Sequence, residues 1–325
     1  MEISGNVAIL LATYNGEKYL DEQICSILAQ TYSDFRVIVR DDCSSDRTPE
    51  ILARWAALQP TKIRVVSDDR GNLKSIGSFS RLMEVCDSPY FAFCDQDDVW
   101  LPTKIELMIS KVQKLENEFG KTMPVLVHSD LTIVDGTLRE ISSSLFHHWQ
   151  INFDKDRRLD HLIINNIVTG CALMGNRALL ELARPIPAGV RVHDWWLALI
   201  AVSCGVLRTM PESTILYRQH DENQIGAGHR KGHILWDARY ILRQPRKLKA
   251  RLERALAICQ SQAQILLRVA GGKMSRRDRE FLRAFCVPIC SAEMTSLPWS
   301  QRSMLLARFL IVYVRALPIA LRWCF

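Results

Sequence analysis

The feature that most constrains the fold is a series of short apolar runs that each end in a polar or acidic turn. Three run-and-turn pairs follow one another along the chain: residues 7–12 before Tyr14-Asn15-Gly16, 35–40 before Asp41-Asp42, and 90–94 before Asp95-Gln96-Asp97-Asp98. Apolar runs of this length are typical of strands buried on both faces of a sheet. Helical periodicity fills the intervals, over 19–30, from 46 onward and over 75–86. Strands that alternate with helices predict an α/β fold with a mostly parallel, Rossmann-like sheet and flanking helices.

The three turns share one place in such a sheet. Parallel strands point the same way, so the segments after them lie at one edge, and ligands of open α/β sheets bind beyond that edge. Residues 63–66 and 125–130 are predicted to be further strands, one helix is expected from Pro102 to about residue 118, and another begins at His193. We therefore expect a ligand site where the polar turns meet.

Charge is divided unevenly along the chain. The formal net charge of the 325 residues is +7, but residues 1–227 carry 23 Lys and Arg against 30 Asp and Glu, whereas residues 228–325 carry 19 against 5. Beyond Gly228 the composition shifts to Arg, Leu, Ala and Gln, with helical periodicity over 234–243, 248–269 and 305–315. We therefore expect a domain boundary near residue 227, followed by a helical basic extension over 228–325.

Residues 95–98, Asp-Gln-Asp-Asp, place three carboxylates at the end of a predicted strand. Their mutual repulsion raises at least one pKa unless a cation lies nearby. Carboxylates on a short turn suit a hard divalent ion, Mg²⁺ or Mn²⁺, which also takes oxygens from phosphate and water. A solvated acidic turn is the alternative, although the position at the ligand edge favours the metal. Asp41 and Asp42 could accept hydrogen bonds from a base or a ribose, or cap the helix that follows.

Three motifs in this order resemble glycosyltransferase family 2 of the GT-A fold: Ala-Thr-Tyr-Asn-Gly at 12–16, Arg-Asp-Asp-Cys-Ser-Ser-Asp-Arg-Thr at 40–48 and Asp-Gln-Asp-Asp-Val-Trp at 95–100. Motifs at 166–174, 193–196 and 217–223 are similar to those of the rhamnosyltransferase-like branch. The resemblance covers about residues 5–227. It implies a GT-A catalytic domain at 1–227, with a nucleotide-sugar half at about 1–100 and an acceptor half at about 101–227.

The resemblance implies a donor-nucleotide site at the first two turns. It assigns the nucleotide to the first turn and the base to an acid after the second strand, and it places a closing segment at 69–77. The residues assigned to the donor nucleotide are Thr13, Tyr14, Asn15, Asp41, Asp42, Asn72, Gly77, Asp95 and Gln96.

The resemblance also implies a Mg²⁺ or Mn²⁺ ion on the donor diphosphate, where the cation offsets the charge of the leaving nucleoside diphosphate. Its ligands are predicted to be Asp95, Asp97 and Asp98, with His220 completing the coordination sphere. A surface histidine is the alternative for His220. Arg218 is predicted to bind a phosphate.

Members of the family invert the anomeric centre, which needs one general base on the acceptor side and no covalent intermediate. The matching residue is Asp194, and Trp195 and Trp196 are expected to desolvate its carboxylate, raise its pKa and stack on sugar faces. The alternative is an acid that caps a helix beside two core tryptophans. The residues that match the lining of the acceptor pocket are Asn166, Thr169 and Gly170.

Residues 305–325 are apolar enough to suggest a transmembrane helix, but Arg308, Arg315 and Arg322 would be costly at the centre of a bilayer. An amphipathic segment in the membrane interface fits better, and the basic residues at 243–254 suit anionic headgroups. A helical cap on the catalytic domain is the alternative. The N-terminus lacks the pattern of a secretory signal, so we expect a cytoplasmic protein that is peripheral on the inner face of the cell membrane.

Together these features predict an inverting, metal-dependent glycosyltransferase. It would move a sugar, for example rhamnose from dTDP-rhamnose, from a nucleotide-sugar donor to a cell-surface polysaccharide or a lipid-linked acceptor. Nucleic acid is not expected as a partner, because no recognisable binding motif accompanies the basic charge. Two rival classes remain: a nucleotidyltransferase, whose Gly-rich phosphate loop with a lysine is missing here, and a catalytically silent membrane-associated assembly protein of the same fold.

Overall fold

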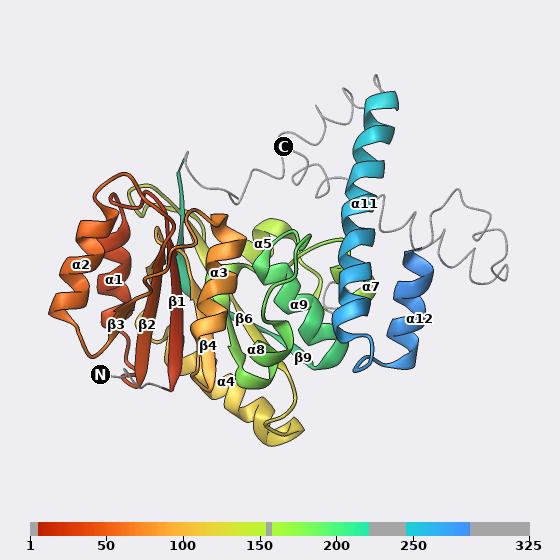
Figure 1. The fold of residues 1–325 in the computed structure, drawn as a ribbon, viewed down its shortest axis with the longest axis horizontal. Coiled ribbons are helices and arrows are strands. Elements are labelled where there is room, and N and C mark those ends of the chain that lie inside the picture. The colour runs from red at the N-terminus through yellow and green to blue at the C-terminus, as the bar shows by residue number, and fades with distance from the viewer. Residues whose placement is uncertain (1–5, 154–157, 221–244, 287–325) are drawn as a thin grey trace.

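One mixed sheet of nine strands forms the centre of the molecule (Figure 1). The computed structural model describes residues 6–153, 158–220 and 245–286. Across the sheet the strands lie in the order β3 (Ile63–Val65), β2 (Phe35–Asp41), β1 (Val7–Thr13), β4 (Tyr90–Cys94), β8 (Leu173–Asn176), β6 (Val125–Asp135), β9 (Val206–Gln219) and β5 (Val99–Trp100). A further strand, β7 (Glu140–Ser142), pairs with β6.

Four of the eight strand pairings in the described sheet are parallel. β1 lies between β2 and β4 with both pairings parallel, and β2–β3 and β6–β9 are parallel as well. β8 runs antiparallel between β4 and β6, and β5 runs antiparallel to β9. The predicted α/β fold is therefore confirmed, and its sheet is mixed: the pairings among β1, β2, β3 and β4 are parallel, and most of those beyond β4 are antiparallel. Its carboxyl edge gathers the ends of β1, β2 and β4, because Thr13 pairs with Asp41 and Leu11 pairs with Cys94.

Helices cover both faces of the sheet. One face carries α1 (Leu20–Leu28), α2 (Thr48–Leu58) and α4 (Lys104–Phe119), and the other carries α3 (Lys74–Val85), α8 (Arg177–Ala183) and α9 (His193–Cys204). In β1, Leu10 belongs to one of the two cores while Ile9 and Leu11 belong to the other, and all three are fully buried. A strand covered on both faces needs an apolar residue at every position, which is the pattern of residues 7–12.

The strands and helices predicted between residues 7 and 204 are present, with ends shifted by a few residues. The long strand β9 was not predicted. Its sequence interrupts apolar alternation with Pro211 and Glu212, and the ladder skips these two residues, since Ser129 pairs with Met210 and Asp130 with Ser213. A bulge of this kind hides the period of two that identifies a strand in a sequence.

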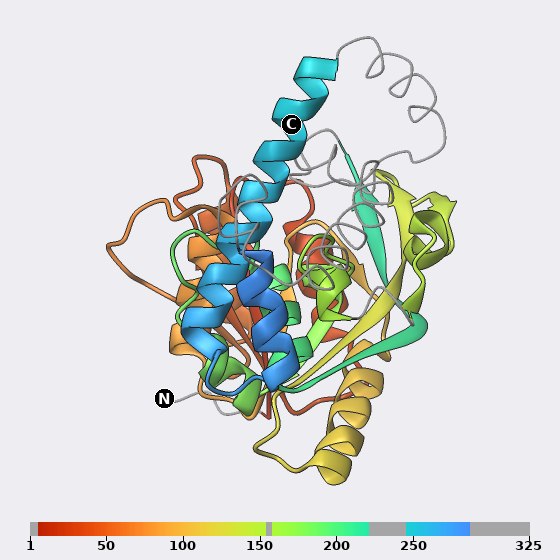
Figure 2. The same ribbon diagram turned by 90° about the vertical axis from the view of Figure 1, so that its right-hand side faces the viewer.

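Two C-terminal helices follow, of which the first packs on α9 and the second on the first. α11 (Pro245–Ala270) and α12 (Arg276–Phe285) lie side by side (Figure 2), and the helix predicted at 248–269 falls within α11. Ala263 and Leu266 of α11 are fully buried in the core that also contains Trp196 of α9. The Gln262 side chain accepts a hydrogen bond from the backbone N–H of Arg191, just before α9, at 2.9 Å.

The other helices predicted in the basic extension, at 234–243 and 305–315, lie outside the described residues. Among the residues that the structure describes, no helix has both the length and the apolar character needed to cross a membrane.

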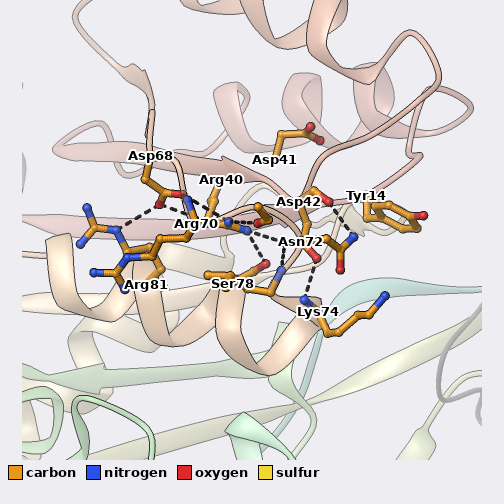
Figure 3. A network of polar contacts seen from close by, with 12 residues as sticks. Tyr14, Arg40, Asp41, Asp42, Asp68, Arg70, Asn72, Lys74, Ser78 and Arg81 are labelled. Atoms are coloured by element: carbon orange, nitrogen blue, oxygen red, sulfur yellow. Dashed lines mark hydrogen bonds and ion pairs between the residues drawn. The ribbon is translucent and has the colours of Figure 1, made fainter.

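A buried network around Arg40, the last but one residue of β2, holds the segment before α3 (Figure 3). The Arg40 guanidinium donates to Asp42 Oδ1 at 2.6 Å, to Ser78 Oγ at 2.9 Å and to the Gly71 carbonyl at 2.7 Å, and it also pairs with Asp68. Its side chain is 3% exposed. One arginine therefore joins the end of β2, the loop at 68–71 and the first turns of α3.

We expect Arg40→Met to lower the free energy of unfolding by about 3–5 kcal/mol, because it leaves the buried Asp42 carboxylate without its cation, whereas Asp68 keeps its ion pair with Arg81. Urea unfolding followed by circular dichroism measures the change. The matched control is Arg47→Met, which removes an ion pair with Glu50 whose two side chains are 77% and 74% exposed. That control should lose less than about 1 kcal/mol. Equal losses in the two variants would contradict the structural role of the Arg40 network.

Candidate active site

The first polar turn and the acidic loop are joined at the carboxyl edge by a side chain. Gln96 accepts a hydrogen bond from the backbone N–H of Tyr14 at 2.8 Å and donates one to the Tyr14 carbonyl at 2.9 Å. A Cβ on Gly16 would collide with the Gln96 amide, so a side chain at this position would displace Gln96 from its contact with Tyr14. The Tyr14 side chain remains 47% exposed beside this pair.

The two acids at the end of β2 have different partners. Asp41 accepts hydrogen bonds from Thr13 Oγ1 at 2.9 Å and from the hydroxyl and backbone N–H of Ser44. Asp42 is buried, and besides Arg40 its carboxylate accepts the backbone N–H groups of Leu73 at 2.6 Å and Lys74 at 2.8 Å. The Asp42 carboxylate is thus committed to the start of α3, whereas Asp41 lies at the turn that carries Thr13 and Tyr14.

The remaining residues assigned to the nucleotide border this turn. Asn15 adopts a left-handed conformation, with φ 49°, and its amide oxygen accepts the N–H of Ser45. Asn72 donates to the Asp42 carbonyl at 2.8 Å and is exposed (Figure 3). Gly77 lies inside α3, where a Cβ would press on Leu73. The closing segment predicted from the sequence is therefore anchored to the end of β2.

The acidic loop between β4 and β5 holds three carboxylates, and two of them, Asp95 and Asp98, lie where ionisation is disfavoured. Burial, together with the charges of Asp97 and Asp194, raises the pKa of Asp95 to about 7. Burial and the charges of Asp97 and Asp95 raise the pKa of Asp98 well above its ordinary value. A cation placed among these groups would reverse both shifts, since an opposite charge favours the ionised form.

The end of β9 supports this loop from behind. The Arg218 backbone N–H donates to Asp98 Oδ1 at 3.1 Å, and the Arg218 Nε donates to the Asp97 carbonyl at 2.8 Å. The rest of the guanidinium donates to the Gly136 carbonyl at 2.8 Å and pairs with Glu22, and the side chain is 2% exposed. The Arg218 guanidinium, predicted to bind a phosphate, thus binds groups of the protein in this structure.

His220, just beyond β9, approaches the same loop. Its Nε2 lies 2.9 Å from Asp97 Oδ2, and its ring lies 5.0 Å from the ring of Tyr19. The four residues predicted to bind a metal thus lie on or beside one loop: Asp97 contacts His220, and the charges of Asp95 and Asp97 act on Asp98.

These donors fit a hard divalent cation. Asp98 Oδ2 is buried and has no hydrogen-bond partner within the described part of the chain. Donor atoms of Asp95, Asp98 and Cys171 lie within 4.8 Å of one another. Burial and the nearby Asp98 and Asp95 charges raise the pKa of the Cys171 thiol well above its ordinary value, which leaves the carboxylates as the donors of the type that Mg²⁺ or Mn²⁺ takes.

A buried lysine behind the loop was missed from the sequence. Lys104, the first residue of α4, is fully buried, donates to the Cys171 carbonyl at 2.9 Å and lies 4.5 Å from the centre of the Trp100 ring. Burial lowers the pKa of Lys104 to about 8, against the opposing effects of nearby Cys171, Cys94 and Asp98. The sequence signal that could have identified Lys104 is its position in the first turn of a predicted helix, where the helix dipole disfavours a cation.

Asp194 lies in the first turn of α9 with its carboxylate buried. Its Oδ1 accepts hydrogen bonds from the Asn166 side chain at 2.9 Å and from the backbone N–H of Trp195 at 2.5 Å. Burial raises the pKa of Asp194 to about 7, although the bonds from Trp195, Gly170 and Asn166 lower it. A Cβ on Gly170 would lie 3.5 Å from Asp194 Oδ2. Asn166 and Gly170, two of the residues matched to the acceptor pocket, therefore both lie beside the Asp194 carboxylate.

The two tryptophans after Asp194 lie in the core, which corrects their expected role in stacking on a sugar. Trp195 is 2% exposed and donates to the Leu162 carbonyl at 2.5 Å, and Trp196 is fully buried and donates to the Ala183 carbonyl at 2.9 Å. Neither indole has a free face for a ligand, so both help to desolvate the region of Asp194 by packing. Thr169 lies at the start of the turn η1 (Gly170–Ala172), half-buried, next to Gly170.

Comparisons with known proteins place the chain in one group of enzymes. The sequence profile described as glycosyl transferase family 2 matches residues 8–182. An uncharacterized glycosyltransferase of Nostoc sp. is 26% identical over 67% of this chain and 66% of its own length. A Shigella flexneri protein named dTDP-rhamnosyl transferase RfbG is 25% identical over 67% of this chain and 74% of its own length. With several first relatives the match spans slightly less than two thirds of their length.

Solved structures agree with the fold. Staphylococcus aureus TarS residues 1–349, in complex with UDP-GlcNAc, superposes with a TM-score of 0.54 over 94% of this chain and 80% of that one, at 13% identity. The full TarS structure gives a TM-score of 0.57 over 98% of this chain and 54% of that one, at 14% identity. Because the family profile covers more than half of the 325 residues, and the sheet and acidic edge agree with it, the chain belongs to glycosyl transferase family 2.

Proposed function

We propose that this protein is an inverting, metal-dependent glycosyltransferase that transfers a sugar from a nucleotide-sugar donor to the hydroxyl of an acceptor. The observation that carries the proposal is the placement of two kinds of carboxylate at one edge. The acidic loop offers Asp95, Asp97 and Asp98 for a cation, while Asp194 lies close enough for its charge to raise the pKa of Asp95. The three carboxylates of the acidic loop suit a metal bound to the donor diphosphate, and the Asp194 carboxylate suits a general base.

The donor site is proposed to use the turn at Tyr14. The Thr13 hydroxyl donates a hydrogen bond to Asp41 there, and Tyr14 is exposed for contact with a nucleotide. Asn15, Asn72, Gly77 and Asp42 would act by shaping and closing the same region. Rhamnose from dTDP-rhamnose is the proposed donor, supported by the name of the Shigella flexneri relative.

The proposed metal is Mg²⁺ or Mn²⁺, held by Asp95, Asp97 and Asp98. Donor atoms of Asp95 and Asp98 lying within 4.8 Å of each other support this, and His220 lies beside Asp97. When bound, such a cation stabilises negative charge on the departing nucleoside diphosphate. The protein's own contribution is to hold the carboxylates in place through the end of β9.

Asp194 is proposed as the general base. Its carboxylate accepts the proton of the acceptor hydroxyl while that oxygen forms a bond to the anomeric carbon, and the bond from this carbon to the nucleoside diphosphate breaks with its electron pair. A pKa near 7 keeps the group basic enough to take the proton and still ionised at neutral pH. Asn166 and the Trp195 N–H hold Oδ1, and Oδ2 is the oxygen proposed to take the proton.

We expect Asp97→Asn to lower kcat/KM at least about 100-fold, because the loop loses a charged metal ligand. Transfer from dTDP-rhamnose, UDP-GlcNAc and other nucleotide sugars is followed by mass spectrometry, and Mn²⁺ binding by electron paramagnetic resonance. Asp34→Asn is the control, because Asp34 is exposed and precedes β2 at the opposite edge of the sheet. Full activity in Asp97→Asn would refute the metal assignment.

We expect kcat/KM at saturating Mn²⁺ to rise with pH and level off above a midpoint near 7, because the base must be ionised and burial raises the pKa of Asp194 to about 7. Well below that midpoint the rate should fall about tenfold per pH unit. Asp95 should not contribute, since bound Mn²⁺ keeps it ionised.

The variant Asn166→Ala should move the midpoint to higher pH, because the bond from Asn166 stabilises the charged form of Asp194. Asn165→Ala is the neighbouring control, since no hydrogen bond from Asn165 to Asp194 is present in the described structure. An acid limb that stays unchanged in both variants would argue against Asp194 as the base.

The acceptor is proposed to be a cell-surface polysaccharide or a lipid-linked sugar, reached at the inner face of the cell membrane. Exposed basic residues on and before α12 support this location: Lys273, Arg276, Arg277 and Arg283. Arg276 already has an acidic partner in Glu280, and both side chains are largely exposed. Anionic headgroups attract such a surface by about 1 kcal/mol for each cation near them.

We expect reversal of Arg276, Arg277 and Arg283 to Glu to weaken binding to phosphatidylglycerol vesicles by about tenfold or more, as the loss of about three lipid-facing cations predicts. Flotation of the full chain with vesicles measures the effect. Reversal of Lys111, Lys114 and Lys121, on and after α4, changes the net charge by the same amount on another part of the molecule. Equal losses in the two triple variants would refute a specific role for α12.

A further inference from the structure

The contact between Gln96 and Tyr14 links two places that the proposed function gives to different parts of the donor. Gln96 stands between Asp95 and Asp97 in the acidic loop, and its amide bonds to both polar groups of the Tyr14 backbone, at 2.8 and 2.9 Å. Such a two-point contact fixes both the distance and the orientation of the partner peptide. A shift of the acidic loop is therefore passed to the Tyr14 backbone.

The opposite side of the acidic loop is fixed as well. Arg218 binds the Asp97 carbonyl through Nε, and its guanidinium lies 4.4 Å from the centre of the Tyr19 ring and pairs with Glu22. Tyr19 and Glu22 belong to the start of α1, which directly follows the turn at Tyr14. Front and rear contacts thus attach the loop to the same stretch of chain.

Packing leaves little freedom for the two segments to move separately. Gly16 has no side chain where Gln96 passes, and a Cβ there would collide with the Gln96 amide. The Gly16 N–H donates to Thr48 Oγ1 at 2.7 Å, which ties the same turn to the first residue of α2. A ligand that orders one segment therefore lowers the entropy cost of ordering the other segment when a second ligand binds. By thermodynamic linkage, each ligand raises the affinity for the other by the same factor.

We propose that Gln96 is a positioning residue that couples nucleoside binding at the Tyr14 turn to cation binding at the acidic loop. The inference rests on the proposed function, because it takes the donor nucleotide and the metal to bind at these two places. It adds a coupling through the protein that is separate from direct bridging of the metal by the diphosphate. Gln96 acts through the Tyr14 backbone and does not need to touch either ligand.

The test uses nucleosides without phosphate, which have no diphosphate to bridge to the metal. Mn²⁺ affinity of the full chain is measured by electron paramagnetic resonance with and without millimolar thymidine, uridine or guanosine. In the unmodified protein at least one nucleoside should tighten Mn²⁺ binding by about fivefold. Gln96→Ala should reduce this factor to nearly one, and Gln96→Glu, which can accept from the Tyr14 N–H but has no amide to donate, should fall between.

Two controls separate a local effect from a loss of structure. Gln59→Ala, at the end of α2, should keep the full coupling, because this residue follows a helix that starts at the carboxyl edge and ends away from it. Thermal unfolding should show that Gln96→Ala remains folded. In that variant the matching nucleoside diphosphate should still tighten Mn²⁺ binding, because the bridge through the diphosphate is intact.

Each outcome has a separate meaning. If none of the nucleosides changes Mn²⁺ affinity in the unmodified protein, or if Gln96→Ala keeps the full factor, the coupling role of Gln96 is overturned. If the nucleoside diphosphates also leave Mn²⁺ affinity unchanged, the metal-diphosphate site of the proposed function is wrong as well. Tightening by diphosphates alone would leave that site standing without the coupling.

Discussion

The acidic loop after β4 sets the conditions for the rest of the site. Burial and neighbouring negative charges both oppose ionisation of Asp95 and Asp98, as the raised pKa values of these two groups indicate. A short turn cannot hold such groups together by its own local structure. The loop is therefore fixed from outside, by Gln96 on the Tyr14 side and by Arg218 and His220 from the end of β9.

Two buried arginines, Arg40 and Arg218, each join several chain segments at the carboxyl edge of the sheet. Arg40 joins Asp42, Asp68 and a loop carbonyl beside the closing segment, and Arg218 joins two carbonyls and Glu22 behind the acidic loop. A guanidinium suits this task because its planar array of donors can bind groups on several chain segments at once. Apart from Asp42, which is two residues from Arg40, the partners lie far from the arginines in the chain, so neither contact pattern has a local sequence signature.

The sequence predicts the elements whose signal is local. Continuous apolar runs identify β1 and β4, and the polar turns after them locate the edge at which the site forms. β9 was not predicted because a bulge at Pro211 and Glu212 interrupts its alternation of apolar and polar residues. The same limit applies to the site: the acids can be named from their spacing, but the commitment of Asp42 to α3 and the burial of Trp196 depend on tertiary packing.

The packing of α11 on α9 bears on how the protein can be divided. Cys204, at the end of the helix that starts near Asp194, donates to the Ala270 carbonyl, and Arg191 before that helix binds Gln262. A fragment that stopped at residue 227 would lose both contacts and expose the apolar surface that Ala263 and Leu266 cover. Such a surface favours aggregation. The smallest soluble unit of this protein is therefore expected to include both C-terminal helices, through residue 286.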